Sequence, residues 1–528
     1  MIKATYCSLL VTCALTLSVP ACEHPHLDGI LGSDNKSVLK VSIHTVFAED
    51  HQTIMVTGTG FNSSNIAENS ILIGKLTTQH PKIYIDSEGR MPETLITIPK
   101  ALELGQSDIS VGNITFAKAL QSKPVRLTLM VWDRKEELPT IERYIRQFEK
   151  ENPSIRVKIN KISAPAQNDL SNLATSSDPG DLIYMSHEAF PEMMAQNYFL
   201  DLTQYWQRDD ANNNFSDIYP KLAKLYSNTG KIFGVPKYFT TLVLYYNKDL
   251  FTKASLPYPS PNWSWTDFLK AAQKLSEMPE QDGKPQYGFA FDSWYGQWLP
   301  WLWQNNGEIF DPVMGRWLMN DSAFIKSNAE SFQFLADLGF KSKVSPAPSP
   351  TNNVDAIKLF MNGQAAMCIS GRWTCMDLRG VQNFSWDLEV LPHKETRATL
   401  LLSTGYGIAA KTLHPEAAWQ LVKYLTGDSV ENSIAEEGLA VPCRKTIAES
   451  TRFLNAAAIG TPLNAQSFIS QLDFARPAPF HKNWPQKRKE LTQMVKLILS
   501  NENAPALETL QKYFSPEKPK EETTLPPQ

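Results

Sequence analysis

The chain has 528 residues, more than one hydrophobic core usually organises, so we expect two or three domains. Hydrophobic residues make up 42% of the chain and charged residues 20%, which is ordinary for a soluble globular protein. The formal net charge of −4 argues against a strongly basic surface, and we therefore expect no nucleic acid as a partner.

The amino terminus has the pattern of an export signal over residues 1–21. Lys3 is followed by an uncharged, largely apolar run that is too short to span a bilayer after export, and Ala21 then precedes Cys22. This ending resembles a bacterial lipobox, in which Cys22 becomes the acylated first residue. Pro20 departs from the usual pattern, so plain secretion is the alternative. We expect an extracytoplasmic protein that a lipid holds to a membrane.

Residues 22–37 are polar and carry no clear period, so we interpret them as a tether. Short β-type runs broken by turn residues fill residues 38–120, which predicts a small antiparallel sandwich. One run, residues 54–61, resembles the immunoglobulin-like IPT/TIG domain, whose second strand ends in a similar G-x-G-F turn. Glycine is expected there because a tight turn needs positive φ. No residue of this region looks catalytic, so we interpret it as a spacer or docking module.

Beyond residue 124, strand-like and helical patterns alternate to about residue 513. A strand-like run at 125–132 leads into an amphipathic pattern at 138–153, and further strand-like runs follow at 155–162 and 181–185. This alternation predicts α/β layering around a largely parallel sheet. Residues 514–528 are rich in proline and charge, and we expect them to be disordered.

The six cysteines fall into two groups. Three lie within the first 22 residues, and Cys368, Cys375 and Cys443 remain for the mature fold. No CxxC or Cys/His spacing suggests zinc, so we expect neither a metal nor a cofactor. One disulfide at most is possible, and Cys368 and Cys375 are the nearest pair. Unpaired, partly buried thiols are the alternative.

Residues 125–513 resemble the family 1 extracellular solute-binding proteins, the maltose-binding-protein-like, sugar-binding subunits of ABC importers. The resemblance rests on several segments that occur in the same order along the chain. These segments are Trp132-Asp133, RQFEKENPSIRV, PGDLI, GKIFGVPKYFTTLVLYYNKDLF, WSWTDFLKAAQKL, FMNGQAAMCISGRW and TGYGIAAKTLHPEAAWQLVKYLTG.

The resemblance implies a two-lobed α/β fold of the type II periplasmic-binding-protein class, with the ligand in the cleft between the lobes. The first lobe is expected at about 125–235 and 402–440, and the second at about 236–400 and 441–513. Such proteins are monomers that close on the ligand by hinge bending and deliver it to the permease subunits of an ABC importer.

A sugar site needs aromatic platforms and planar hydrogen-bonding groups, because sugars present hydroxyls and weakly polar C–H faces. Four of the 13 tryptophans lie within residues 294–303. The resemblance places Trp294 at the cleft, whereas we expect Trp301 and Trp303 in the helix core. It also places a turn at residues 371–373, where Trp373 would be a stacking platform and Arg372 would bind hydroxyls or a carboxylate. A structural role for this turn is the alternative.

The first lobe carries candidates at the ends of its predicted strands. Glu188 matches a carboxylate position used by relatives and lies at the carboxyl edge of a sheet, where open α/β sheets bind ligands. A charged Lys237 beside Arg372 would favour an acidic sugar, and a solvated lysine is the alternative. Residues 403–407 are expected to form a flexible strand-to-helix turn that exposes backbone N–H groups and a tyrosine ring. The candidates of this lobe are Trp132, Asp133, Glu188, Lys237, Tyr238, Thr404, Gly405 and Tyr406.

Two other functions compete with solute binding. A glycosidase would need two carboxylates about 5–10 Å apart, and Asp133 and Glu188 could face one cleft. No Ser/His/Asp, metal or phosphate-loop signature accompanies them, so we expect a binding protein and not an enzyme. The second alternative is a surface adhesion or interaction protein that uses the immunoglobulin-like domain.

Overall fold

The structure is a computed structural model that describes most of residues 124–513 and seven strands before them. The chain divides into two compact units, residues 1–125 with 153–156 and the remaining residues. Cys22, the predicted signal peptide, the tether and the carboxyl-terminal tail lie outside the described residues. Also outside are residues 133–136, 163–172, 174–175, 177, 280–284, 312, 348–353, 456–463, 480–483, 501 and 503–504.

The described part of the first unit consists of strands in two antiparallel sheets. One sheet has the order β1-β2-β5 and the other the order β4-β3-β6-β7. These strands overlap the β-type runs of the sequence, and the immunoglobulin-like assignment stays a prediction. The strands are β1 (Lys40–Ala48), β2 (His51–Thr59), β3 (Ile71–Ile73), β4 (Leu76–Thr77), β5 (Arg90–Thr97), β6 (Gly105–Val111) and β7 (Ile114–Ser122).

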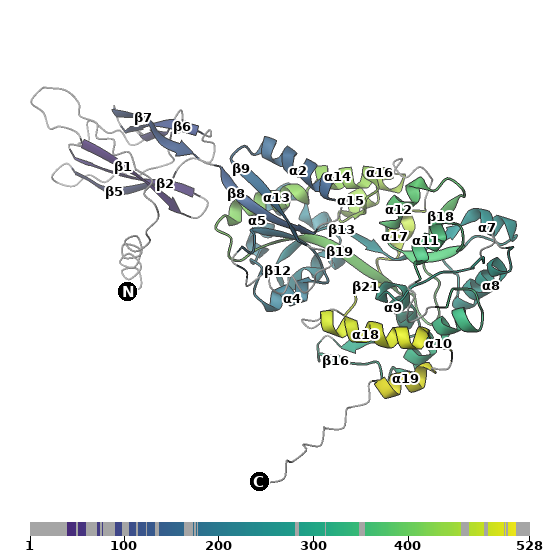
Figure 1. Cartoon of the computed structure of the whole chain (residues 1–528). Coiled ribbons are helices and arrows are strands. Elements are labelled where there is room, and N and C mark those ends of the chain that lie inside the picture. Colours follow the sequence, from purple (N-terminus) through teal and green to yellow (C-terminus); the bar gives the residue numbers. More distant parts are fainter. Residues whose placement is uncertain are drawn as a thin grey trace, which may run out of the picture. The chain divides into compact units, whose positions relative to one another are not determined.

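The second unit folds into two α/β lobes, and the first lobe is built on a mixed sheet (Figure 1). Its strand order is β20-β13-β19-β10-β8-β9, with β21 added beside β19. The expectation of a largely parallel sheet is wrong, because β19 enters from the second lobe and runs antiparallel to β10 and β13, although it pairs in parallel with β21. The strands are β8 (Val125–Trp132), β9 (Ile155–Ile162), β10 (Leu182–Ser186), β13 (Gly234–Thr241), β19 (Thr399–Ile408), β20 (Val441–Pro442) and β21 (Ala475–Arg476).

Helices cover the first-lobe sheet, and the amphipathic pattern predicted at 138–153 forms one of them. In this helix, α2 (Leu138–Glu151), the apolar positions at helical spacing are buried, which confirms the prediction. Pro139 fits its first turn, where a missing backbone N–H costs nothing. The other elements are α4 (Phe190–Ala195), α5 (Thr203–Asn213), η1 (Phe215–Asp217), α6 (Pro220–Leu225), β11 (Ser227–Asn228), β12 (Lys231–Ile232), α13 (Pro415–Leu425), α14 (Asp428–Glu437) and α15 (Lys445–Ala448).

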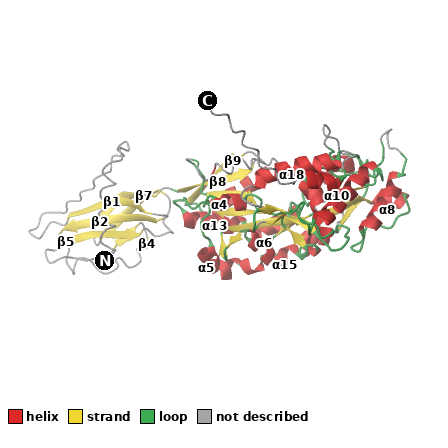
Figure 2. Cartoon of the chain, turned by 90° about the horizontal axis from the view of Figure 1, so that it is seen from below, coloured by secondary structure: helices red, strands yellow, loops and turns green. Residues whose placement is uncertain are grey.

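The second lobe surrounds a smaller antiparallel sheet of order β17-β14-β18 with many helices (Figure 2). The aromatic segment forms α9 (Tyr295–Gln304), and Trp301 and Trp303 are buried, as predicted. The terminal helices α18 and α19 pack against α10. The other elements are β14 (Val243–Asn247), α7 (Lys248–Lys253), α8 (Trp265–Ser276), β15 (Phe310–Asp311), β16 (Arg316–Trp317), α10 (Ile325–Phe340), α11 (Ala356–Met361), β17 (Met367–Ser370), α12 (Thr374–Asp377), η2 (Leu378–Gly380), β18 (Trp386–Glu389), α16 (Thr451–Leu454), α17 (Gln466–Ser470), α18 (Trp484–Leu499) and α19 (Ala506–Tyr513).

The two lobes are joined where β13 passes into β14 and where β19 returns. Leu242, the single residue between β13 and β14, donates its backbone N–H to the carbonyl of Leu400 at 3.3 Å. The Leu242 carbonyl accepts from the Thr399 hydroxyl at 2.8 Å and from the Gln471 side chain at 3.0 Å. The crossing strands are therefore hydrogen-bonded to each other where the chain passes between the lobes.

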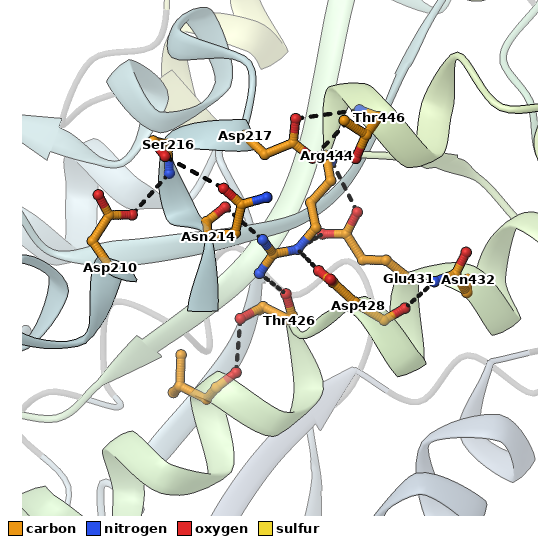
Figure 3. Close-up of polar contacts among 11 residues, drawn as sticks. Asp210, Asn214, Ser216, Asp217, Thr426, Asp428, Glu431, Asn432, Arg444 and Thr446 are labelled. Atoms are coloured by element: carbon orange, nitrogen blue, oxygen red, sulfur yellow. Dashed lines mark hydrogen bonds and ion pairs between the residues drawn. The ribbon is translucent and has the colours of Figure 1, made fainter. Parts of the chain in front are cut away.

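A buried arginine connects several elements of the first lobe (Figure 3). Arg444 follows β20 and donates to the backbone carbonyls of Asn214 at 2.6 Å and Thr426 at 2.9 Å. Its Nε lies 3.0 Å from a carboxylate oxygen of Asp428, and its backbone N–H donates to Glu431 at 2.9 Å. One side chain thus ties together the ends of α5, α13 and β20 and the helix α14.

The three cysteines of the described region are buried and free, so the alternative of unpaired thiols is confirmed. Burial raises the pKa of Cys368 and Cys443 well above the usual value of a thiol. Among the described residues, no helix is both long enough and apolar enough to cross a membrane.

Candidate functional site

A β-bulge in β13 directs the first cluster of candidate residues. Pro236 pairs with Gly405 of β19 and Tyr238 pairs with Thr404, so Lys237 is an extra residue between two adjacent pairs. A bulge bends the strand and re-aims the side chain of the extra residue. Lys237 is only 3% exposed, so the alternative of a solvated lysine is wrong.

The ammonium group of Lys237 lies among three tyrosine rings. Its distances to the ring centroids are 4.7 Å for Tyr184, 5.2 Å for Tyr238 and 5.8 Å for Tyr406. Cation–π attraction of this kind partly replaces the lost hydration of the charge. Burial nevertheless lowers the pKa of Lys237 to about 8, while the nearby carboxylate of Glu137 acts in the opposite direction.

Glu137, immediately before α2, connects the tyrosines into a hydrogen-bonded network. Its two carboxylate oxygens accept from the hydroxyls of Tyr184 at 2.7 Å and Tyr238 at 2.8 Å. The two hydroxyls also contact each other, and that of Tyr184 lies 3.2 Å from the hydroxyl of Thr404. Burial raises the pKa of Tyr184 well above its usual range, so its hydroxyl keeps its proton at neutral pH. We name Glu137, Tyr184, Lys237, Tyr238 and Tyr406 the tyrosine cluster.

The expected turn at 403–407 is wrong, because these residues lie within β19. Gly405 pairs with Met185 on one side and Pro236 on the other, and Tyr406 is fully buried. Glycine is needed there for a different reason than a turn. A Cβ on Gly405 would lie 2.5 Å from the carbonyl oxygen of Val235, so the residue marks a close approach of two strands.

The second lobe contributes two tryptophans in contact with each other. Trp294 precedes α9 and Trp373 precedes α12. Their ring centroids are 6.0 Å apart with an interplanar angle of 71°, an edge-to-face arrangement. Trp373 is 37% exposed, a high value for a tryptophan, and Trp294 is half-buried. Large aromatic surface is thus left open at this position.

A hydrogen bond connects the tryptophan pair to the first lobe. The hydroxyl of Tyr295, the residue after Trp294, donates to the carboxylate of Glu188, which follows β10. The Tyr295 and Trp294 rings lie 5.3 Å apart. Glu188, Tyr295, Trp294 and Trp373 therefore form one continuous series of contacts from the first lobe to the second.

Arg372 has different surroundings from its neighbour Trp373. Its guanidinium carbon lies 5.0 Å from the ring centroid of Phe453 and 5.5 Å from that of Phe468, and the side chain is 1% exposed. Its Nη1 is 3.6 Å from the sulfur of Cys375. Within the described part of the chain, Nε and Nη2 have no hydrogen-bond partner. These contacts do not test the ligand-binding role that the sequence predicts for Arg372.

The remaining candidates of the first lobe are less defined. Trp132 ends β8, but only its backbone is described, and Asp133 lies outside the described residues. The carboxylate pair that a glycosidase would need is therefore untested. Sequence reasoning missed three residues that the structure brings to the site: Glu137, Tyr184 and Tyr295. Only the position of Tyr295 beside Trp294 could have indicated one of them.

A separate groove of about 1190 Å³ lies on the second lobe between α8, α10 and the start of α19. Its lining includes Trp265, Leu269 and Phe334 and none of the described candidate residues. The candidate site and this groove are therefore distinct surfaces.

Comparison with known proteins agrees with this architecture. A family model of the bacterial extracellular solute-binding proteins matches residues 132–432, more than half of the chain. A multiple sugar-binding protein of Streptococcus mutans is 25% identical over 347 residues, covering 61% of this chain and 76% of that protein. A galactooligosaccharide-binding protein of Bacillus subtilis is 24% identical over 364 residues, covering 66% and 79%.

Among solved structures, an ABC substrate-binding protein of Listeria monocytogenes in complex with cycloalternan has a similar fold. The TM-score is 0.65 at 23% identity, and the match covers 74% of this chain and 97% of that one. The match to more than half of the sequence shows that the chain belongs to the family of bacterial extracellular solute-binding proteins.

Proposed function

We propose that the protein captures a sugar or oligosaccharide between its two lobes and delivers it to an ABC importer. The observation that carries the proposal is the contact between Trp294 and Trp373, whose exposed aromatic surface suits the C–H faces of a sugar ring. The relatives named as a multiple sugar-binding protein and a galactooligosaccharide-binding protein support the same ligand class.

The first lobe would supply the polar contacts that a sugar requires. Tyr238 is half-buried, and its hydroxyl already takes part in the network around Glu137. A sugar hydroxyl would extend that network without leaving a buried polar group unpaired. Direct contacts from Trp132, Asp133 and Thr404 are part of the proposal, whereas the buried Lys237 would act through the tyrosine rings around it.

Closure of the lobes would couple capture to transport. The Glu188–Tyr295 hydrogen bond joins the lobes, and the crossing strands meet at Leu242 and Leu400. A ligand that contacts both lobes binds the closed form better than the open form and shifts the population toward it. A permease could then distinguish loaded from empty protein by its conformation.

Ligand screening tests the function. Thermal-shift and calorimetric measurements with neutral sugars, acidic sugars and polyols should identify at least one stabilising ligand. At about 100 times its dissociation constant, a ligand adds ~2.7 kcal/mol to the unfolding free energy. If no compound of a broad panel produces a shift or a heat of binding, the carbohydrate proposal is wrong.

Three tryptophan variants then test the site. Trp373→Ala and Trp294→Ala should each weaken binding by roughly 1–3 kcal/mol, or about ten- to a hundredfold, with the fold intact. Trp301→Ala is the matched control, because Trp301 is 1% exposed and packs in the core. It should mainly destabilise the fold, by ~3–5 kcal/mol. Loss of affinity at Trp301 alone would contradict the choice of site.

We also propose that Cys22 carries the membrane anchor, with the tether and the amino-terminal domain as a spacer. Two acyl chains retain a protein on a membrane, whereas one binds only marginally. A tether of this length reaches only some 20 Å as a random coil, so the domain would supply much of the distance from the lipid. Cell fractionation of wild type and Cys22→Ser decides the matter. Equal solubility of the two would show that the protein is merely secreted.

A further inference from the structure

Each tryptophan of the pair lies against a glycine two residues away. A Cβ built on Gly296 would be 2.3 Å from the Cη2 and Cζ3 atoms of the Trp294 ring. A Cβ built on Gly371 would be 2.2 Å from Cζ3 and 2.5 Å from Cη2 of Trp373. Carbon atoms in favourable contact stand about 3.5–4.0 Å apart, so each ring occupies space that any side chain would take.

The backbone conformation does not explain these two glycines. Neither Gly296, in the first turn of α9, nor Gly371, after β17, has positive φ. An alanine could therefore adopt the same backbone angles at either position. The absence of a Cβ leaves room for the indole ring to lie against the main chain.

We infer that Gly296 and Gly371 are positioning residues that set the orientation of both tryptophan rings toward the ligand. The inference rests on the proposed carbohydrate binding at this pair. Because the rings meet edge to face, a displacement of one ring also removes the support of the other. Trp294 in turn contacts Tyr295, so a displaced ring also disturbs the residue that bonds Glu188.

Alanine substitution at the glycines moves the rings without removing them. Gly371→Ala and Gly296→Ala should each weaken sugar binding by roughly tenfold, which is within the range for loss of a stacking platform. Gly380→Ala is the matched control in the same lobe. Gly380 is exposed and has no positive φ, and a Cβ there would meet no atom within 4 Å. The sugar affinity of Gly380→Ala should therefore equal that of wild type.

A double-mutant cycle separates positioning from general damage. If Gly371 acts only through Trp373, then Gly371→Ala should cause no further loss of affinity in a Trp373→Ala protein. Should Gly371→Ala alone lower thermal stability, the double variant should recover it, because the ring that clashes is gone. Additive losses of affinity in the cycle would overturn the inference, as would wild-type affinity of both single glycine variants.

Circular dichroism provides a readout that needs no ligand. The indole transitions of two rings at this separation couple, so the difference spectrum between wild type and Trp373→Ala should contain an exciton couplet. Gly371→Ala and Gly296→Ala should reduce the same couplet, and Gly380→Ala should leave it unchanged. A wild type that binds no sugar but shows this pattern would refute the proposed function and keep the positioning role. An unchanged couplet in both glycine variants would refute the positioning role.

Discussion

Two arginines of this protein are equally buried but differently compensated. Arg372 and Arg444 are each 1% exposed. The guanidinium of Arg444 meets two backbone carbonyls and the carboxylate of Asp428 within 3.0 Å. The guanidinium of Arg372 faces two phenylalanine rings and the thiol of Cys375, with two nitrogens unpartnered among the described residues.

The difference shows that burial alone does not define the role of a charged side chain. A buried charge is tolerated when its surroundings replace the hydration that it loses. At Arg444, oxygen atoms replace the lost hydration, and these oxygens belong to elements far apart in the sequence (Figure 3). At Arg372 the described neighbours are polarisable groups, which give weaker compensation. We therefore expect large consequences of substitution at Arg444 and small ones at Arg372.

The largest effect is expected for Arg444→Met. Removal of one partner of a buried ionic network leaves the other polar groups uncompensated, which costs about 3–5 kcal/mol of unfolding free energy. The backbone carbonyls of Asn214 and Thr426 would lose their donor, and the carboxylate of Asp428 would lose its cationic partner. Urea denaturation at neutral pH measures the change.

Arg452→Met is the matched control for this prediction. Arg452 pairs with Glu436 at the surface, where both side chains are about half exposed, and such pairs contribute roughly 0–1 kcal/mol. Equal effects of the two substitutions would contradict the view that the partners of Arg444 determine its importance.

The charge of Lys237 is compensated to a degree intermediate between those of the two arginines. It has three aromatic rings and a nearby carboxylate but no hydrogen bond in the described structure. With its pKa lowered to about 8, the folded protein releases this proton before the unfolded chain does. The unfolded state then binds more protons above pH 8, so stability rises with pH. Relative to Lys237→Met, wild type should gain about 1.4 kcal/mol between pH 7 and 9.

Urea denaturation at pH 7, 8 and 9 checks this difference. Tyr184 and Tyr406 do not interfere, because burial raises the pKa of both hydroxyls well above 10. Lys274→Met is the control, since Lys274 is 56% exposed and should show no such dependence. A parallel pH response of wild type and Lys237→Met would mean that Lys237 keeps an ordinary pKa.

The sequence was sufficient for the first elements of the α/β region and for part of the core. The periodicity of α2 predicted its buried residues, because local spacing determines which face of a helix is apolar, whereas every residue of α9 is buried. The direction of β19 could not be predicted, since it depends on a strand that returns from another lobe.

The site was harder to predict than the fold for a related reason. Gly405 indicated a turn, but glycine is required there because the carbonyl of Val235 on a neighbouring strand leaves no room for a Cβ. The burial of Lys237 depends on a bulge and on rings from two other strands. Both features depend on contacts between residues far apart in the sequence, whereas the pattern of a single sequence reports only local interactions.

The smallest effect is expected for Arg372→Met, which also decides whether Arg372 touches the ligand. Methionine fills a similar space and removes a charge that no described oxygen compensates, and this gain opposes the lost attraction to Phe453 and Phe468. We expect a change in unfolding free energy within about 1 kcal/mol of zero. Sugar affinity should stay near that of wild type, because the guanidinium is 1% exposed and faces those two rings. A tenfold loss of affinity with unchanged stability would instead show that Arg372 turns toward the ligand when the lobes close, as a ligand-binding role requires.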